Sequence, residues 1–167
     1  MRRTVTFLLA LLLSATVQSG CGTSTSPCDG TAQVPPRNEE RVSIEQGLWG
    51  DVWFWEGDFI PTCPTGSVTP VGREMRIHEI ASLSDVVHVG NGVFYSEVNT
   101  PLAATVWSDA NGFFQSSLPP GQYSVFVVED ALLYANGLNG EGHIFPIEVE
   151  MGAATEAHFD ITYLAVQ

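Results

Sequence analysis

The sequence contains no lysine. Its six basic residues are all arginines, against 19 aspartates and glutamates, which gives a formal net charge of −13 at pH 7. Without the first 20 residues, which include Arg2 and Arg3, this charge falls from −13 to −15. Proteins that bind nucleic acid need a basic surface to neutralise the phosphates. The composition therefore excludes a nucleic-acid partner, while the acidity favours solubility without identifying a ligand.

Long hydrophobic runs are also missing. The most apolar stretch, residues 5–13, is far shorter than the roughly 20 residues that a membrane-spanning helix needs. It follows Arg2 and Arg3 and precedes small and polar residues that continue up to Cys21. This order of charged, apolar and small residues is typical of an export signal. We therefore expect residues 1–20 to be a signal peptide that directs the chain out of a bacterial cytoplasm.

The residues that end this signal, Ser19, Gly20 and Cys21, resemble the lipobox of bacterial lipoproteins. Gln18 departs from the lipobox pattern, which usually has an aliphatic residue at that place. The resemblance implies a lipid on Cys21 that anchors the protein in the cell envelope, at the outer membrane. The alternative is cleavage by an ordinary signal peptidase, which would release a secreted protein.

Cysteine is scarce, with three residues in the chain. An odd number of cysteines in an exported protein requires an explanation, and lipidation of Cys21 leaves two. We expect Cys28 and Cys63 to form one disulfide in an oxidising compartment. Two unpaired thiols are the alternative, because the sequence does not show whether the two Cα atoms approach closely enough.

The chain after the signal divides into two parts. Residues 21–46 are rich in Thr, Ser, Pro, Gly and charge, and such a segment buries too little apolar surface to order itself, so we expect a flexible tether. Residues 47–167 have the size and apolar content of one domain. Short β-branched and aromatic runs recur there between turn residues, with no helical periodicity. The pattern predicts an all-β sandwich of about seven strands, at 47–55, 71–79, 104–108, 112–118, 122–129, 144–150 and 156–163.

Two turn motifs flank the fourth of these segments, 112–118. Asp109-Ala110-Asn111-Gly112 predicts a tight hairpin between 104–108 and 112–118, because Asn-Gly tolerates the positive φ angles of such a turn. Leu118-Pro119-Pro120-Gly121 predicts the next reversal, into 122–129, whose apolar residues on both faces indicate a central strand.

These motifs together resemble a known family. Ser108-Asp109, Asn111-Gly112-Phe113-Phe114 and Leu118-Pro119-Pro120-Gly121-Gln122-Tyr123-Ser124-Val125 are similar to the hairpin and core strand of the carboxypeptidase regulatory-like domain. The resemblance implies a single prealbumin-like or immunoglobulin-like antiparallel β-sandwich over 47–167. It also implies an accessory, binding or assembly role with no catalytic residues, since the family motifs encode turns and a core strand.

A row of tryptophans is the sharpest local feature of the first predicted strand. Trp49, Trp53 and Trp55 share one face of an extended strand, and Glu56 and Asp58 follow them. If that face is exposed, the indoles and carboxylates form a sugar-binding platform, with Trp53, Trp55, Glu56 and Asp58 as ligand-binding residues. If it faces inward, the indoles belong to the core, which we favour because indoles are mostly buried.

The sequence offers little evidence for metal binding or for catalysis. Asp51, Glu56, Asp58 and Asp109 supply oxygen ligands that calcium uses, but without the spacing of a calcium loop. The histidines show no paired metal-ligand spacing, and no serine lies in a nucleophile elbow. We therefore expect no metal, no cofactor and no catalytic residue. The sequence predicts a non-enzymatic envelope lipoprotein that binds an envelope protein or glycan; the alternative is a carbohydrate- or calcium-binding accessory domain of a surface hydrolase system.

Overall fold

The computed structural model describes residues 33–60, 64–90 and 92–167. The predicted signal peptide and the three cysteines, Cys21, Cys28 and Cys63, lie outside the described residues. The described part is all-β and forms a sandwich of two sheets, with two short 3-10 helices, η1 (Glu39–Arg41) and η2 (Leu83–Asp85). Within it, no helix is long and apolar enough to cross a membrane.

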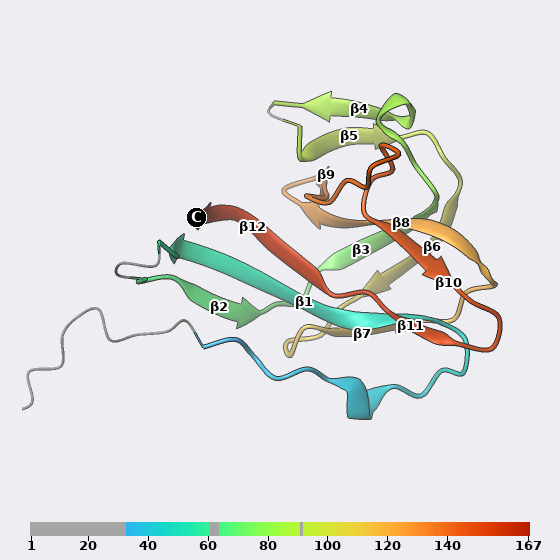
Figure 1. The fold of residues 1–167 in the computed structure, drawn as a ribbon, viewed down its shortest axis with the longest axis horizontal. Coiled ribbons are helices and arrows are strands. Elements are labelled where there is room, and N and C mark those ends of the chain that lie inside the picture. The colour runs from blue at the N-terminus through green and yellow to red at the C-terminus, as the bar shows by residue number, and fades with distance from the viewer. Residues whose placement is uncertain (1–32, 61–63, 91) are drawn as a thin grey trace, which may run out of the picture.

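The first sheet is built around one long strand, β1 (Gly47–Asp58). On one side β1 pairs in parallel with β11 (Ala154–Glu156) and then with β12 (Phe159–Val166). On the other side it pairs antiparallel with β7 (Phe113–Ser116) and β2 (Ser67–Pro70). The first and last strands of the domain are thus neighbours, in the lower layer of Figure 1.

The second sheet has seven strands, and its hydrogen bonds are antiparallel throughout. Six strands follow the order β4-β5-β9-β8-β3-β6, and β10 pairs with the first half of β8. Their bounds are β3 (Glu74–Glu79), β4 (Val86–Val89), β5 (Phe94–Val98), β6 (Leu102–Trp107), β8 (Gly121–Glu129), β9 (Leu132–Tyr134) and β10 (Pro146–Val149).

The core lies between the sheets and also behind the second one. Val125 and Val127 on β8 are fully buried beside Met75 and Ile77 of β3, their register partners. Phe126 points the opposite way and is also fully buried. Both faces of β8 are therefore covered, which confirms the prediction of a central strand at 122–129.

The outer cover of β8 comes from a segment in which the sequence predicts no strand, residues 80–103. It contains η2 and the hairpin β4–β5, drawn at the top of Figure 1. Tyr95 of β5 is buried, and its ring packs edge-on against Phe126, with centroids 5.8 Å apart. Val86 and Ala81 are buried in the same hydrophobic cluster. The hairpin, which forms one edge of this same sheet, thus contributes apolar packing to the face of β8 that carries Phe126.

The predicted hairpin at Asp109–Gly112 is wrong. The strand before it, β6, pairs with β3 in the second sheet, whereas the strand after it, β7, pairs with β1 in the first. The turn therefore carries the chain between the layers. The Asp109 carboxylate accepts hydrogen bonds from the backbone N–H groups of Asn111 and Phe113, and Gly112 takes a φ of 80°. A Cβ at Gly112 would lie 2.6 Å from the Val52 carbonyl oxygen, so the crossing requires glycine.

Seven strands appear at the predicted places, as β1, β3, β6, β7, β8, β10 and β12. The described residues also contain β2, β4, β5, β9 and β11, which the sequence does not predict. All five have at most five residues and little alternation, so their side chains carry no clear periodic signal. The all-β sandwich is confirmed, with twelve strands in the described part and two parallel pairings in the first sheet.

Candidate functional site

The tryptophan row lies on the outer face of the first sheet. Leu48 and Val52 of β1 point into the core, so Trp49, Trp53 and Trp55 point away from it. Yet Trp49 is only 7% exposed and Trp53 only 4%. The row is outside the sandwich core and still largely buried, because another part of the chain covers it.

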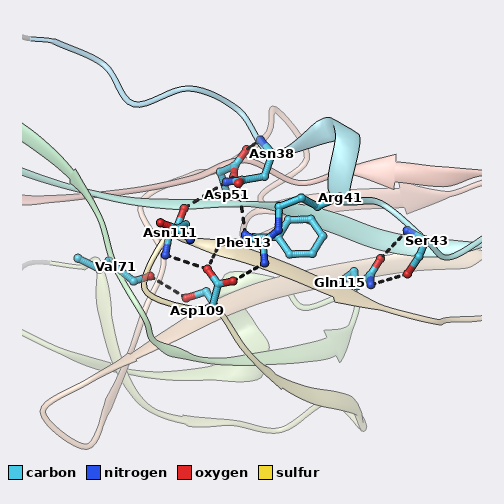
Figure 2. Close-up of polar contacts among 10 residues, drawn as sticks. Asn38, Arg41, Ser43, Asp51, Val71, Asp109, Asn111, Phe113 and Gln115 are labelled. Carbon is cyan, nitrogen blue, oxygen red and sulfur yellow. Dashed lines mark hydrogen bonds and ion pairs between the residues drawn. The ribbon is translucent and has the colours of Figure 1, made fainter.

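That cover is the segment of residues 37–46, which we call the N-terminal strap. It runs along the outer face of the first sheet, below β1 and β7 in Figure 1. The side-chain amide of Asn38 donates a 2.5 Å hydrogen bond to the carboxylate of Asp51, which is fully buried. Figure 2 shows this contact and the second bond from the same amide, to the Asn111 carbonyl.

Two arginines of the strap reach aromatic rings of the sheet. The Arg41 guanidinium lies 4.3 Å from the centre of the Phe113 ring and pairs with Asp109 at 2.5 Å (Figure 2). The Arg37 guanidinium lies 5.6 Å from the Trp53 ring and pairs with Glu156. Both arginines combine a cation–π contact with an ion pair.

Further along the strap, Ser43 and Gln115 exchange two hydrogen bonds (Figure 2). Gln46 donates to the Leu118 carbonyl and accepts from the N–H of Gly152. Residues 37–46 therefore differ from the free tether expected over 21–46, and residues 21–32 lie outside the described part. The composition of this segment predicts that it does not fold by itself. Composition gives no information about the polar and cation–π contacts that hold the segment to a sheet elsewhere in the sequence.

Beside the strap, Trp55 and His158 converge on one carboxylate. The indole N–H of Trp55 donates to Asp160 at 2.7 Å, and Nε2 of His158 lies 2.9 Å from the same oxygen. Burial opposes ionisation of Asp160, but these two hydrogen bonds outweigh it and lower its pKa. The His158 ring packs edge-on against Trp53, with centroids 4.2 Å apart. The Asp160 carboxylate is thus already engaged, whereas Nδ1 of His158 and the indole N–H of Trp53 are buried without a hydrogen-bond partner among the described residues.

The two other predicted ligand-binding residues do not join this cluster. The Asp58 carboxylate accepts a hydrogen bond from the N–H of Ile60 in the turn after β1, while Glu56 is exposed. The structure gives no support to the calcium hypothesis. Asp51 is hydrogen-bonded to Asn38, and Asp109 is hydrogen-bonded to Arg41. In the described ranges, no group of three His, Cys, Asp or Glu residues is arranged to hold a metal ion.

A different part of the sandwich offers an open cavity. We call it the end cleft; its volume is about 310 Å³, near the lower end of the usual range for ligand pockets. It lies where the β4–β5 and β8–β9 connections approach β12, and it is lined mainly by apolar atoms. Its lining residues are Val89, Gly90, Phe94, Glu129, Asp130, Leu132 and Tyr163.

One carboxylate of the end cleft is fixed by two neighbours. Glu129 is 7% exposed; one of its oxygens accepts from the Arg73 guanidinium and the other from the Tyr163 hydroxyl at 2.8 Å. Burial and these contacts with Glu129 raise the pKa of Tyr163 to about 12. The phenol therefore stays protonated at neutral pH and keeps its hydrogen bond to Glu129.

The mouth of the end cleft is a strained turn. Asp130 and Ala131 join β8 to β9 with φ angles of 47° and 69°, the left-handed conformation that non-glycine residues rarely adopt. The Asp130 side chain is exposed there. Such strain often marks functional sites. Sequence reasoning missed this turn because it has no glycine, and the only local signal was the acidic pair that ends an apolar strand.

Comparison of this chain with known protein families, curated proteins and solved structures finds no match.

Proposed function

We propose that this protein is a non-enzymatic binding module of the bacterial cell envelope, anchored by a lipid on Cys21, and that its ligand occupies the end cleft. Membership of the carboxypeptidase regulatory-like family, with the accessory role it implies, is part of this proposal. The partner is an envelope protein or glycan that presents an apolar group carrying a positive charge.

The observation that carries the proposal is the chemistry of the end cleft. Its walls include Phe94, Leu132 and Tyr163, which offer apolar and aromatic contact. Glu129 is already paired with the Arg73 guanidinium and hydrogen-bonded by the Tyr163 hydroxyl, so binding an apolar group there leaves no charge unpaired. Asp130 remains exposed at the rim, where it attracts a cation. These features support recognition, whereas catalysis would need a free acid, base or nucleophile.

The sugar-platform alternative gains less support. A stacking platform needs exposed aromatic faces, but Trp49 and Trp53 are buried, and Arg37 of the strap lies over Trp53. The partly exposed Trp55 uses its indole N–H on Asp160. The tryptophan row is better explained as part of the surface on which the strap packs than as a carbohydrate site.

The anchor is tested by the intact mass of the protein expressed with its own signal and recovered from bacterial membranes. We expect a di- or triacylated chain beginning at Cys21, lighter by two hydrogens if Cys28 and Cys63 are joined. A soluble product without lipid would overturn the anchor and leave a secreted protein.

The end cleft is tested by titrating the ¹⁵N-labelled protein with phenethylammonium, a phenyl ring that carries a cation. We expect saturable shifts of the amide signals of residues 129–132 and 163, with a Kd of about 1 mM, the range of a small fragment. Leu132→Trp, which fills the cleft, should abolish them. Leu138→Trp, at an exposed leucine elsewhere, should not. Asp130→Asn should weaken binding without abolishing it.

No saturable shift at about ten times that concentration would contradict the assignment of the cleft. Equal binding by the Leu132→Trp variant would do the same. Both results are independent of the mass measurement, so the site and the anchor can fail separately.

A further inference from the structure

The edges of the two sheets are protected unequally. The outer edge of β12, in the first sheet, is capped by side chains from the second sheet. The backbone N–H of Thr162 donates to the Tyr134 hydroxyl at 3.0 Å, and the Asn136 amide donates to the Asp160 carbonyl at 3.1 Å. Capping of this kind prevents another strand from adding at that edge.

The outer edge of β6, in the second sheet, has no such protection. Its ladder bonds run to β3, with an irregularity at Ala103, where the register shifts between Ile77 and His78. In the described ranges no other strand or side chain is hydrogen-bonded to its far side. The part of this edge that pairs regularly with β3 is therefore residues 104–107. The strand reads Leu-Ala-Ala-Thr-Val-Trp, with no charge and no proline. Trp107, at its end, is 65% exposed. Native proteins usually guard an edge of this length with charges, proline or a cover.

Charge distinguishes this edge from the rest of the molecule. The chain carries a net charge of −13, so two copies repel each other at most orientations. Beside β6, the exposed-face residues of β3 are Glu74 and Arg76, which pair with each other at 3.0 Å. Charges further away are screened over about 8 Å at physiological salt. The edge of β6 is therefore a neutral strip at which two acidic copies can meet.

We propose that β6 pairs antiparallel with β6 of a second copy, which extends the second sheet across a two-fold axis. The axis passes through Thr105, so that Thr105 faces its own equivalent. In this register, the core-facing residues of both copies lie on the same face of the extended sheet, and Val106 lies opposite Ala104 of the second copy. On the other side Trp107 lies opposite Ala103 of the second copy, a large residue against a small one. The interface is self-complementary, as two-fold symmetry requires.

The test measures the molar mass of the full-length protein, in density-matched detergent if lipidated, by sedimentation equilibrium. We expect a concentration-dependent dimer. Thr105→Lys, which places two ammonium groups at the axis, should weaken it at least about tenfold, and so should Trp107→Ala. Val87→Lys is the matched control, since Val87 is exposed on β4 at the opposite edge of the same sheet and should leave the dimer unchanged.

Salt provides a second readout. Raising it screens the repulsion between acidic copies, so dimerisation through a neutral edge should strengthen, whereas a dimer held by ion pairs would weaken. A monomer at all concentrations and salts would overturn the proposal and leave the edge for an extended peptide of another protein. Dissociation by Val87→Lys but not by Thr105→Lys would also overturn it.

Discussion

The outer faces of the two sheets are covered by different means. On the outer face of the second sheet, Tyr95 of the sheet's own β4–β5 hairpin packs with its apolar neighbours on Phe126, so the cover is an extension of the core. Behind the first sheet the N-terminal strap uses Asn38 and two arginines to hold itself over buried aromatic rings. Apolar packing gains stability from every atom removed from water, whereas the strap depends on a few polar contacts.

The two covers should differ most in how much stability is lost when the phenylalanine below each is removed. These residues are Phe126 in the second sheet and Phe113 in the first. Phe126→Ala should lower the free energy of unfolding by about 3–5 kcal/mol, because it leaves a cavity in tightly packed surroundings. Phe113→Ala should cost less, since Phe113 is covered mainly by the Arg41 side chain, which can settle into the space. Urea unfolding of both variants measures the difference, and equal losses would mean that the strap packs as rigidly as the hairpin.

The next effect concerns the buried carboxylate below the strap. Asn38→Ala removes the side-chain amide donor of Asp51, so the variant should lose about 1–3 kcal/mol of unfolding free energy. Adding Asp51→Asn to that variant should restore part of the loss, because a buried amide is less costly than a buried carboxyl group whose remaining Asn38 donor is the backbone N–H. If the double variant is the less stable of the two, the Asn38 contact is not what stabilises Asp51.

A smaller effect, with a pH signature, is expected at Arg41. Its hydrogen bond to Asp109, helped by the backbone N–H groups of the turn, lowers the pKa of Asp109. A lowered folded-state pKa means that the pair stabilises the fold above the unfolded-state pKa of Asp, about 4. That stability is lost as the pH falls through the lower, folded-state pKa.

Arg41→Ala should therefore lower the stability only slightly at pH 7, as expected for an exposed ion pair with a cation–π contact. The gap between this variant and the parent should shrink as the pH falls below about 4. Thermal unfolding at pH 7 and pH 3 measures it. A gap of constant size would show that the Phe113 contact, and not the carboxylate, carries the effect.

The smallest effect is expected at Ser43. Its hydroxyl and N–H bond the exposed side chain of Gln115, where water competes for the same groups. Ser43→Ala should change stability by less than about 0.5 kcal/mol. A larger loss in thermal unfolding would mean that the whole strap, and not its first half, is cooperatively attached.

The contrast between the covers also explains how far the sequence predicts the fold. Long strands such as β1 and β8 carry periodic apolar patterns, and their positions were predicted. The turn at Asp109–Gly112 was assigned correctly as a turn but joined to the wrong partner strands, because turn chemistry does not specify which sheet comes next. The strap was missed because each of its contacts links residues far apart in sequence.

The candidate site was less predictable than the fold. The sequence directs attention to the row of Trp49, Trp53 and Trp55, and the preference for burial agrees with the structure, although the cover is the strap and not the core. The end cleft combines Phe94, Glu129 and Tyr163 from three separate strands. None of these residues belongs to a motif, so only their assembly in space reveals the cleft.

The parallel pairing of β1 with β12 also sets the order of events in folding. Val52 pairs with Phe159, so the central strand of the first sheet acquires one neighbour only after nearly the whole domain has been synthesised. Contacts between such distant residues are costly in loop entropy and form slowly. We therefore expect the first sheet to be completed only once β12 is present.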